Sequence, residues 1–211
     1  MDDGYGIIVW NNTFRFELQN TDTKEKTITD APIPDDKEWI HLAATWDNKT
    51  REVILYIDGV RQDQIGFFNG PIGISDQHLN MGRNERWSHR NCSLASSEFR
   101  VWDRARTGNE IQATMNERLK GDELGLVGYW PFNEKAGTIV KSGLITEGID
   151  GTIVNPIWGT TDALPFSDET PFCEVRVSEF IQRQTLTLQG GLLYRNGNNR
   201  KAADTLESAR I

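Results

Sequence analysis

The chain has 211 residues, and its 23 lysines and arginines against 31 aspartates and glutamates give a formal net charge of −8. Because nucleic-acid faces and polybasic membrane patches need clustered cations to meet phosphates, this balance argues against both kinds of partner. No segment approaches the roughly 18 consecutive apolar residues of a membrane-spanning helix, and the acidic N-terminus lacks the pattern of a signal peptide. We therefore expect a soluble, globular and acidic protein without membrane insertion.

Strand patterns begin near the N-terminus. Residues 7–10 and 13–18 flank the turn formers Asn11 and Asn12, and residues 13–18 alternate apolar and charged side chains as a half-buried strand does. The polar stretch 19–36 has prolines near its end and fits a loop or an edge strand. These patterns predict a first hairpin followed by a less regular segment.

A second hairpin signal is stronger. Residues 39–46 form an apolar run, and the β-branched stretch 52–57 leads into Asp58 and Gly59. Asp-Gly between apolar runs favours a tight hairpin, because glycine tolerates the positive φ that the turn requires. Residues 60–65 are the expected returning strand.

One helix is predicted between strands in the second half of the chain. Thr107 followed by Glu110 is typical of a helix N-terminus with a capping box. Gly121 marks the expected C-terminus, and Ile111 begins an apolar face that continues at residues 115 and 119. Short strands are expected around this helix, within 71–82 and at 99–102, 126–132, 151–154 and near 158, whereas residues 83–97 are predicted to be a long polar loop.

The composition changes near residue 167. Residues 167–172 are typical of a linker, residues 175–193 fit either a strand pair or an irregular helix, and residues 199–211 are polar and favour a helix. We therefore divide the chain into a domain at residues 1–166 and, at residues 167–211, a linker with a polar C-terminal extension or the start of another unit.

Several segments together resemble one known family. They are WIHLAATWDNKTREVILYIDGV (39–60), GPIGISDQHLNMGRN (70–84), EFRVWDRARTGNEIQATM (98–115), GLVGYWPFNE (125–134) and GTIVNPIW (151–158). In this order they resemble the laminin-G-like branch of the concanavalin A-like jelly rolls. The resemblance implies an all-β fold, namely an antiparallel jelly-roll β-sandwich with one short surface helix, followed here by the C-terminal extension.

The chain departs from the family pattern at its start, because the usual opening strands do not precede Tyr5. We therefore expect an N-terminally incomplete domain, either a fragment of a longer protein or a fold completed in another way. An unpaired sheet edge templates association, so a partner chain or strand exchange at that edge is also expected.

Catalytic residues are not expected. Glucan hydrolases of the jelly-roll class carry alternating acids on one strand, and retaining enzymes need two carboxyl groups about 5–5.5 Å apart. The nearest candidates here, Glu98 and Asp103, flank the strand at 99–102 and would point to opposite faces. A glycoside hydrolase is therefore the third-ranked hypothesis.

The resemblance also implies calcium, which many relatives hold at the rim of the sheets. Calcium needs six to eight oxygen ligands, so several loops must contribute. The candidate ligands, Asp47, Asn48, Asp76 and Asn80, all lie in expected loops. Each of them is equally an ordinary turn former that bonds its own backbone.

One loop has the composition of a contact surface. It places a lone tryptophan among cations and amides, and such a tryptophan stacks on a sugar while its neighbours bond the hydroxyl groups. It also fits an acidic glycan or a carboxylate-rich partner. The alternative is that the tryptophan packs back into the end of the sandwich. The candidate ligand-binding residues are Arg83, Asn84, Arg86, Trp87, His89 and Arg90.

Other aromatic and charged residues have a structural interpretation. Arg100 and Arg104 are expected to pair with Glu98 and Asp103 in a solvated surface network of little energetic weight. Tryptophans in strands beside apolar neighbours are predicted to be core, and these are Trp39, Trp46, Trp102 and Trp130.

These interpretations predict a non-catalytic recognition or adhesion module that binds a carbohydrate or a protein partner, assisted by calcium. The alternative is a structural spacer in a larger assembly that contacts only protein. The resemblance implies an extracellular or cell-surface location. Cys92 and Cys173 fit either one disulfide or two thiols.

Overall fold

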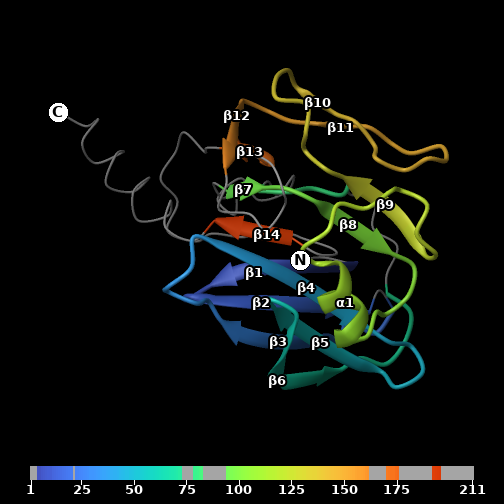
Figure 1. The fold of residues 1–211 in the computed structure, drawn as a ribbon. Helices are drawn as coiled ribbons and strands as arrows, with labels where there is room; N and C mark the ends of the chain where they lie inside the picture. The colour runs from blue at the N-terminus through green and yellow to red at the C-terminus, as the bar shows by residue number, and fades with distance from the viewer. Residues whose placement is uncertain are drawn as a thin grey trace.

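The computed structural model describes residues 4–20, 22–72, 78–82, 94–161, 170–175 and 192–195. Within these ranges the chain consists of antiparallel strands and one short helix (Figure 1). The elements, in chain order, are β1 (Gly4–Trp10), β2 (Thr13–Gln19), β3 (Lys26–Pro32), β4 (Trp39–Trp46), β5 (Glu52–Ile57), β6 (Val60–Phe67), β7 (Leu94–Ser96), β8 (Phe99–Trp102), α1 (Gly108–Thr114), β9 (Leu126–Trp130), β10 (Ile139–Val140), β11 (Gly151–Thr152), β12 (Pro156–Thr161), β13 (Thr170–Val175) and β14 (Leu192–Arg195).

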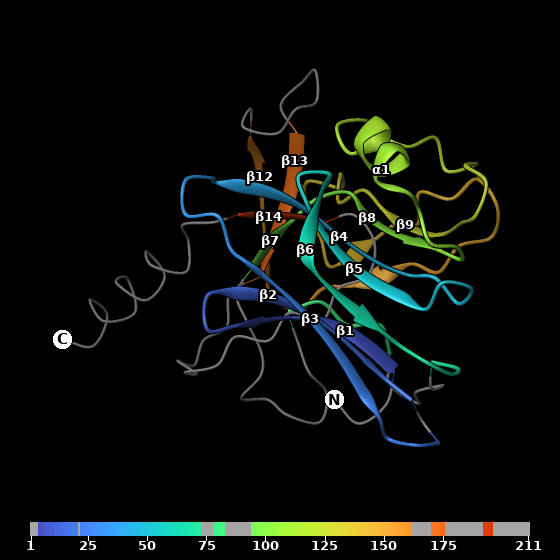
Figure 2. The ribbon, with the colours of Figure 1, turned by 90° about the horizontal axis from the view of Figure 1, so that it is seen from below.

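The described strands pair in the orders β1-β2-β3, β14-β4-β5-β6, β12-β13-β7, β8-β9 and β10-β11. The first two groups meet where β3 lies beside β6 (Figure 2). There the Oγ1 atoms of Thr27 and Thr29 donate to the carbonyl oxygens of Phe67 and Gln64, at 2.7 and 2.6 Å. The described part of the chain thus confirms the expected all-β class.

Both predicted hairpins form, because their turn residues adopt the left-handed conformation. Asn11 and Asn12 have φ values of 47° and 59° between β1 and β2. Asp58 and Gly59 have φ values of 49° and 73° between β5 and β6. Two consecutive residues with positive φ match the twist of the flanking strands, and Asn, Asp and Gly accept this conformation most easily.

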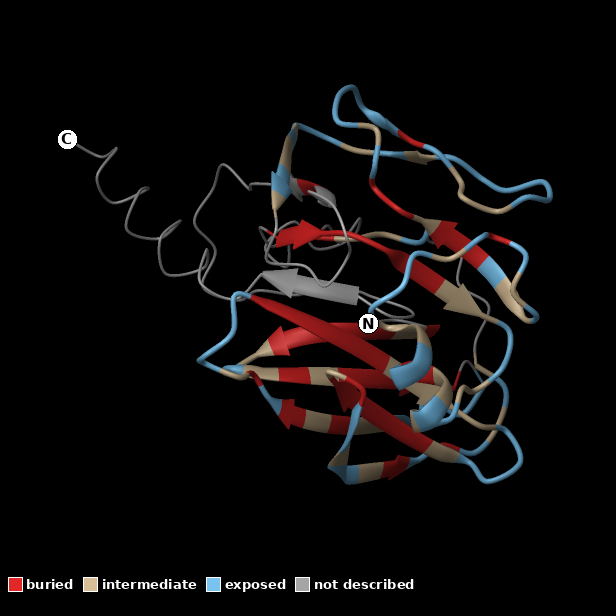
Figure 3. Cartoon of the chain, viewed as in Figure 1, coloured by how far each residue is buried: buried red, intermediate tan, exposed pale blue. Residues whose placement is uncertain are grey.

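The core lies between strands β1, β2, β4 and β5 on one side and β7, β8 and β13 on the other, among the residues coloured as buried in Figure 3. Alternate residues of each strand point into it, as the period of two requires. Strands β7, β8 and β13 contribute Leu94, Phe99 and Cys173. Strands β1, β2, β4 and β5 contribute Ile7, Val9, Phe14, Phe16, Leu18, Ile40, Leu42, Val53, Leu55 and Ile57.

Helix α1 packs against the opposite face of β4 and β5, where Ile111 joins Ala43, Ile54 and Tyr56 in a smaller apolar cluster. Its N-terminus has the predicted capping box, since Thr107 accepts from the Glu110 N–H and the Glu110 side chain accepts from the Thr107 N–H. These contacts fix the helix beside the tip of the second hairpin.

The predicted C-terminus of the helix is wrong. The helix ends at Thr114, with Met115 as its C-cap, and Gly121 lies further along the chain. Arg100 of β8 donates to the main-chain oxygen atoms of Thr114 and Glu117, so these carbonyl groups are occupied by a side chain instead of another helical turn. Gly121 meets a different need, because a Cβ atom there would lie 2.0 Å from the Gly143 oxygen.

The remaining differences concern segments without strong periodicity. The polar stretch 19–36 contains β3, which agrees with the edge-strand alternative, and the expected loop 83–97 ends in β7. Strand β13 pairs with β12 and β7, and β14 pairs with β4. Part of the segment predicted as a linker and extension is therefore hydrogen-bonded to strands of the preceding domain.

The described residues include no helix long and apolar enough to cross a membrane. Cys173 is buried, whereas Cys92 lies outside the described residues, so their pairing stays a prediction.

Candidate functional site

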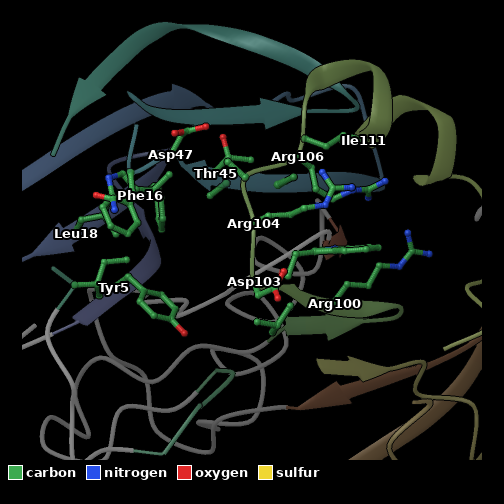
Figure 4. A pocket seen from close by; sticks show the side chains of 18 of the residues that line it. Tyr5, Phe16, Leu18, Thr45, Asp47, Arg100, Asp103, Arg104, Arg106 and Ile111 are labelled. Carbon is green, nitrogen blue, oxygen red and sulfur yellow. The ribbon is translucent and has the colours of Figure 1, made fainter. Parts of the chain in front are cut away.

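An open cavity of about 630 Å³ lies on one side of the described structure. One wall consists of β4 and the turn after it, within residues 41–49, and another of β8 and the segment leading to α1, residues 100–106. The volume falls in the range of roughly 300–1,000 Å³ that is typical of small-molecule sites. The cavity is completed by Tyr5, Phe16, Leu18, Ile72 and Ile111 (Figure 4).

The turn after β4 forms the polar rim of the cavity. Asp47 Oδ1 accepts hydrogen bonds from the N–H groups of Lys49 and Thr50, at 2.6 and 3.2 Å, so this carboxylate is held by its own turn. Asn48 and Lys49 are exposed beside it. The rim therefore offers a carboxylate, an amide and an ammonium group at fixed backbone positions.

The opposite wall carries a stacked pair of large side chains. The guanidinium of Arg106 lies over the ring of Trp102, 4.2 Å from its centroid. Arg106 also donates to Thr114 Oγ1 at 2.9 Å and to the Glu110 main-chain oxygen at 2.6 Å. Burial lowers the pKa of Arg106 from its usual value. This arginine is thus held by an aromatic face and two neutral acceptors.

Arg104, next to this pair, has a carboxylate partner. Its Nη2 atom lies 2.6 Å from Glu110 Oε1. That hydrogen bond, together with the N–H of Thr107, lowers the pKa of Glu110 to about 2. The expected partner of Arg104 was Asp103, and this pairing is wrong because the capping glutamate brings its carboxylate back over the segment.

A buried polar network lies behind the cavity wall. Arg100 and Glu98 are 2% and 3% exposed and pair at 3.0 Å, and Tyr129 donates to the same Glu98 oxygen at 2.8 Å. Burial, followed by the Glu98 charge, raises the pKa of Tyr129. The pair was correctly expected, but its surface location was wrong, because Tyr129 and the end of α1 cover it.

His41 of β4 lines the same cavity and is 7% exposed. Its backbone N–H donates to Asp58 Oδ1 at 2.9 Å, which joins β4 to the second hairpin turn. Burial, and after it the positive charge of Arg100, lowers the pKa of the imidazole to about 3. The side chain is therefore neutral at physiological pH and adds no charge to the cavity.

The predicted calcium ligands divide into three groups. Asp47 and Asn48 lie together at the cavity rim. Asn80 donates its amide to the His78 oxygen at 2.9 Å and is not among the residues lining this cavity. Asp76 lies outside the described residues. Within the described ranges, no group of three or more His, Cys, Asp or Glu side chains is placed to hold a metal ion.

All six predicted ligand-binding residues lie outside the described ranges, so this prediction stays untested: Arg83, Asn84, Arg86, Trp87, His89 and Arg90. Sequence reasoning did not select the cavity residues Trp46, Trp102 and Arg106. The two tryptophans were predicted to be core, whereas both are half-buried and line the cavity. The available signal was the run Asp103 to Arg106, an unusually charged connection between a strand and a helix.

The comparisons with known proteins give one result. A laminin-G-like family model, described as the concanavalin A-like lectin/glucanases superfamily, matches residues 2–112, which is more than half of the chain. No curated protein and no solved structure matches the chain significantly. The matched residues run from the first hairpin into α1 and include both main walls of the cavity. The chain therefore belongs to the concanavalin A-like lectin/glucanases superfamily.

Proposed function

We propose that this chain is a non-catalytic recognition module that binds carbohydrate in the cavity. Membership of the superfamily is compatible with carbohydrate or protein binding. The choice of carbohydrate rests on one observation, the combination of aromatic and polar side chains around a cavity of about 630 Å³. Aromatic rings suit the apolar faces of a sugar, and a few placed polar groups suit its hydroxyl groups.

The aromatic part comes from three separate strands. Tyr5 of β1, Trp46 of β4 and Trp102 of β8 line the cavity and are all half-buried. Trp46 is held by a hydrogen bond from its Nε1 to the Phe68 oxygen at 3.4 Å. Side chains fixed in this way lose little conformational entropy when a ligand binds.

We propose that the module is not catalytic, because the carboxylates at the cavity are not arranged as the pair that a glycoside hydrolase uses. A glycosidase uses two carboxyl groups on either side of the scissile bond. Of the two carboxylates that line the cavity, Asp47 is engaged by its own turn and Asp103 is exposed. Glu98, which does not line the cavity, is enclosed with Arg100 and Tyr129. Incubation with β-glucans should release no reducing ends, and measurable turnover would refute this part of the proposal.

Calcium assistance is a secondary part of the proposal. Of the predicted ligands, the described residues place only Asp47 and Asn48 at the rim, fewer oxygens than the six to eight that calcium requires. These residues alone do not complete a calcium site. Binding lost on chelation would show that further loops supply the missing ligands, whereas unchanged binding would reject calcium.

The first experiment is a glycan array with the whole chain, run with calcium and with a chelator. Trp102→Ala should abolish binding, because it removes an aromatic wall of the cavity. Trp10→Ala is the matched control, since Trp10 is also half-buried beside an arginine, Arg15, 5.9 Å from its ring, but does not line the cavity. Equal loss in both variants, or binding that survives Trp102→Ala, would contradict the assignment.

A protein-binding spacer is the second candidate, and a different surface favours it. Leu124, Ile145 and Ile149, in the loops between α1 and β11, are 87%, 69% and 82% exposed. The loops that carry Leu124 and Ile145 are joined, because the Ile145 N–H donates to the Gly121 oxygen at 3.2 Å. Contiguous exposed apolar surface is typical of protein contacts. The spacer would be supported if the chain bound no glycan on the array and if Ile149→Glu abolished binding of a protein partner. Both candidates share the proposed extracellular or cell-surface location.

A further inference from the structure

The cavity is lined by three arginines whose charges are balanced differently. Arg100 pairs with Glu98 at 3.0 Å, and Arg104 pairs with Glu110 at 2.6 Å. Arg106, in contrast, bonds only neutral acceptors among the described residues, namely a threonine hydroxyl and a main-chain carbonyl. The charge of Arg106 is thus the one arginine charge at this cavity that has no contacting carboxylate within the described ranges.

Two N–H donors of these arginines are enclosed by the protein. The Nε atoms of Arg100 and Arg106 are buried and have no hydrogen-bond partner among the described residues. Because these Nε atoms are buried, they do not face a ligand in the cavity, and the N–H groups that remain for a ligand are those on the Nη atoms of Arg106. Figure 4 shows the three arginines gathered on one side of the cavity and Tyr5, Phe16 and Leu18 on the other.

Arg106 is also preorganised. Its ring contact with Trp102 and its two hydrogen bonds hold the guanidinium in place before any ligand arrives. Those two bonds use one N–H of each Nη atom, which leaves a second N–H on each Nη atom for a further acceptor, whereas the Nε–H is buried. A carboxylate matches the fork of N–H groups better than a single oxygen does.

We propose that the arginine end of this cavity binds the carboxylate of an acidic sugar, a hexuronate, with Arg106 as its ion-pair partner. This inference rests on the proposed carbohydrate-binding function and names its ligand class. The aromatic lining favours a sugar over an acidic peptide, because Trp46 and Trp102, one face of which Arg106 covers, line the same cavity. The lining also holds two carboxylates, Asp103, whose charge is exposed and screened by solvent, and Asp47, which is bound to its own turn.

The test compares sugars that differ only in the charged group. Isothermal titration of the whole chain with methyl glucuronide and methyl glucoside, and with the matching galacturonide and galactoside, isolates the carboxylate. We expect at least one uronide to bind about tenfold or more tightly than its neutral counterpart, because a charge-assisted fork replaces a hydroxyl contact. Addition of a chelator should leave this preference unchanged.

Two variants locate the effect. Arg106→Gln should remove the preference for the uronide, whereas Lys49→Gln, which removes another cation from the same cavity, should preserve it. If Arg106→Gln does not fold, Arg106→Lys keeps the charge and loses the fork, and its preference should fall at least about threefold. Thermal unfolding of each variant checks that the fold is intact.

Other outcomes separate this inference from the proposed function. Equal binding of uronides and neutral sugars, with loss on Trp102→Ala, would overturn the uronate and leave carbohydrate binding standing. If Arg106→Gln and Lys49→Gln lose the uronide preference equally, the preference comes from the summed positive charge of the cavity, and the specific role of Arg106 is overturned. Tighter binding of an acetylated triglutamate peptide, or no sugar binding at all, would overturn the inference as well.

Discussion

Strands β1, β2, β4 and β5 are held in place by buried apolar side chains, whereas the segment from β8 to α1 combines two buried apolar side chains, Phe99 and Ile111, with ion pairs and hydrogen bonds. In the first region Phe14 and Leu55 are fully buried among other apolar residues. In the second, Arg100 occupies an equally buried position and depends on Glu98 for its charge balance. The cavity lies where the two regions meet, so one supplies rigid aromatic and apolar surface and the other supplies charge.

The largest expected loss of stability comes from a substitution in the apolar region. Phe14→Ala removes a fully buried ring and should lower the free energy of unfolding by about 3–5 kcal/mol, from lost burial and the cavity left behind. Urea denaturation measures the change. Phe67→Ala is the control, because Phe67 is 66% exposed and should cost below about 0.5 kcal/mol. Similar losses in the two variants would show that Phe14 does not lie in the core.

The next largest loss of stability is expected from a substitution in the segment from β8 to α1. Arg100→Met leaves the Glu98 carboxylate buried without its cation and should cost about 3 kcal/mol of unfolding free energy. Arg104→Met removes a partly exposed pair with Glu110 and should cost about 0.5 kcal/mol. Chemical denaturation of both variants tests the contrast, which fails if the two arginines contribute equally.

A pH series sharpens the comparison, because His41 is a titratable group inside the apolar strand β4. Folding lowers its pKa to about 3, so below the unfolded value near 6.5 the unfolded chain binds the proton first. The free energy of unfolding should therefore decrease as the pH falls below the unfolded pKa, by up to about 1.4 kcal/mol per pH unit from this group. In His41→Phe, this part of the pH dependence of the unfolding free energy should be missing between about pH 6 and about pH 5.

The control for that series is the exposed His78. His78→Gln should keep the acid sensitivity of the natural chain, as measured by urea unfolding at each pH. An unchanged slope in His41→Phe would mean that other groups account for the acid response.

The smallest effect concerns the cap of α1. Thr107→Ala removes the side-chain acceptor for the Glu110 N–H and should cost about 1 kcal/mol. Thr107→Ser keeps the hydroxyl and should restore most of the stability, as thermal unfolding can show. A serine variant as unstable as the alanine variant would assign the loss to the missing methyl group instead of the cap.

Local patterns in the sequence predict the local parts of the fold. Asn11 with Asn12 and Asp58 with Gly59 predict both hairpins, because a turn is determined by the residues within it. The capping box at Thr107 and Glu110 is equally local. The end of α1 is not, since it depends on Arg100, which approaches from another strand.

The candidate site was harder to predict because it depends on distant partners. The pair of Glu98 and Arg100 was expected from spacing, but its burial requires Tyr129, which lies 31 positions further along the chain. Trp102 has the neighbours of a core residue in sequence and becomes a cavity wall only when β4 and its turn face it. The predicted ligand loop and Asp76 stay outside what the structure can test.

The shortness of α1 has a consequence for when the cavity is complete. A helix of seven residues is not stable by itself in water, so it forms only while its tertiary contacts exist. Gln112 donates to the Gly59 oxygen at 3.0 Å, and Arg100 donates to the Thr114 oxygen at the C-terminus of the helix, so the helix is tied both to the second hairpin and to β8. Hydrogen exchange in α1 should therefore follow global unfolding, and a partly folded chain would lack the wall that carries Arg106.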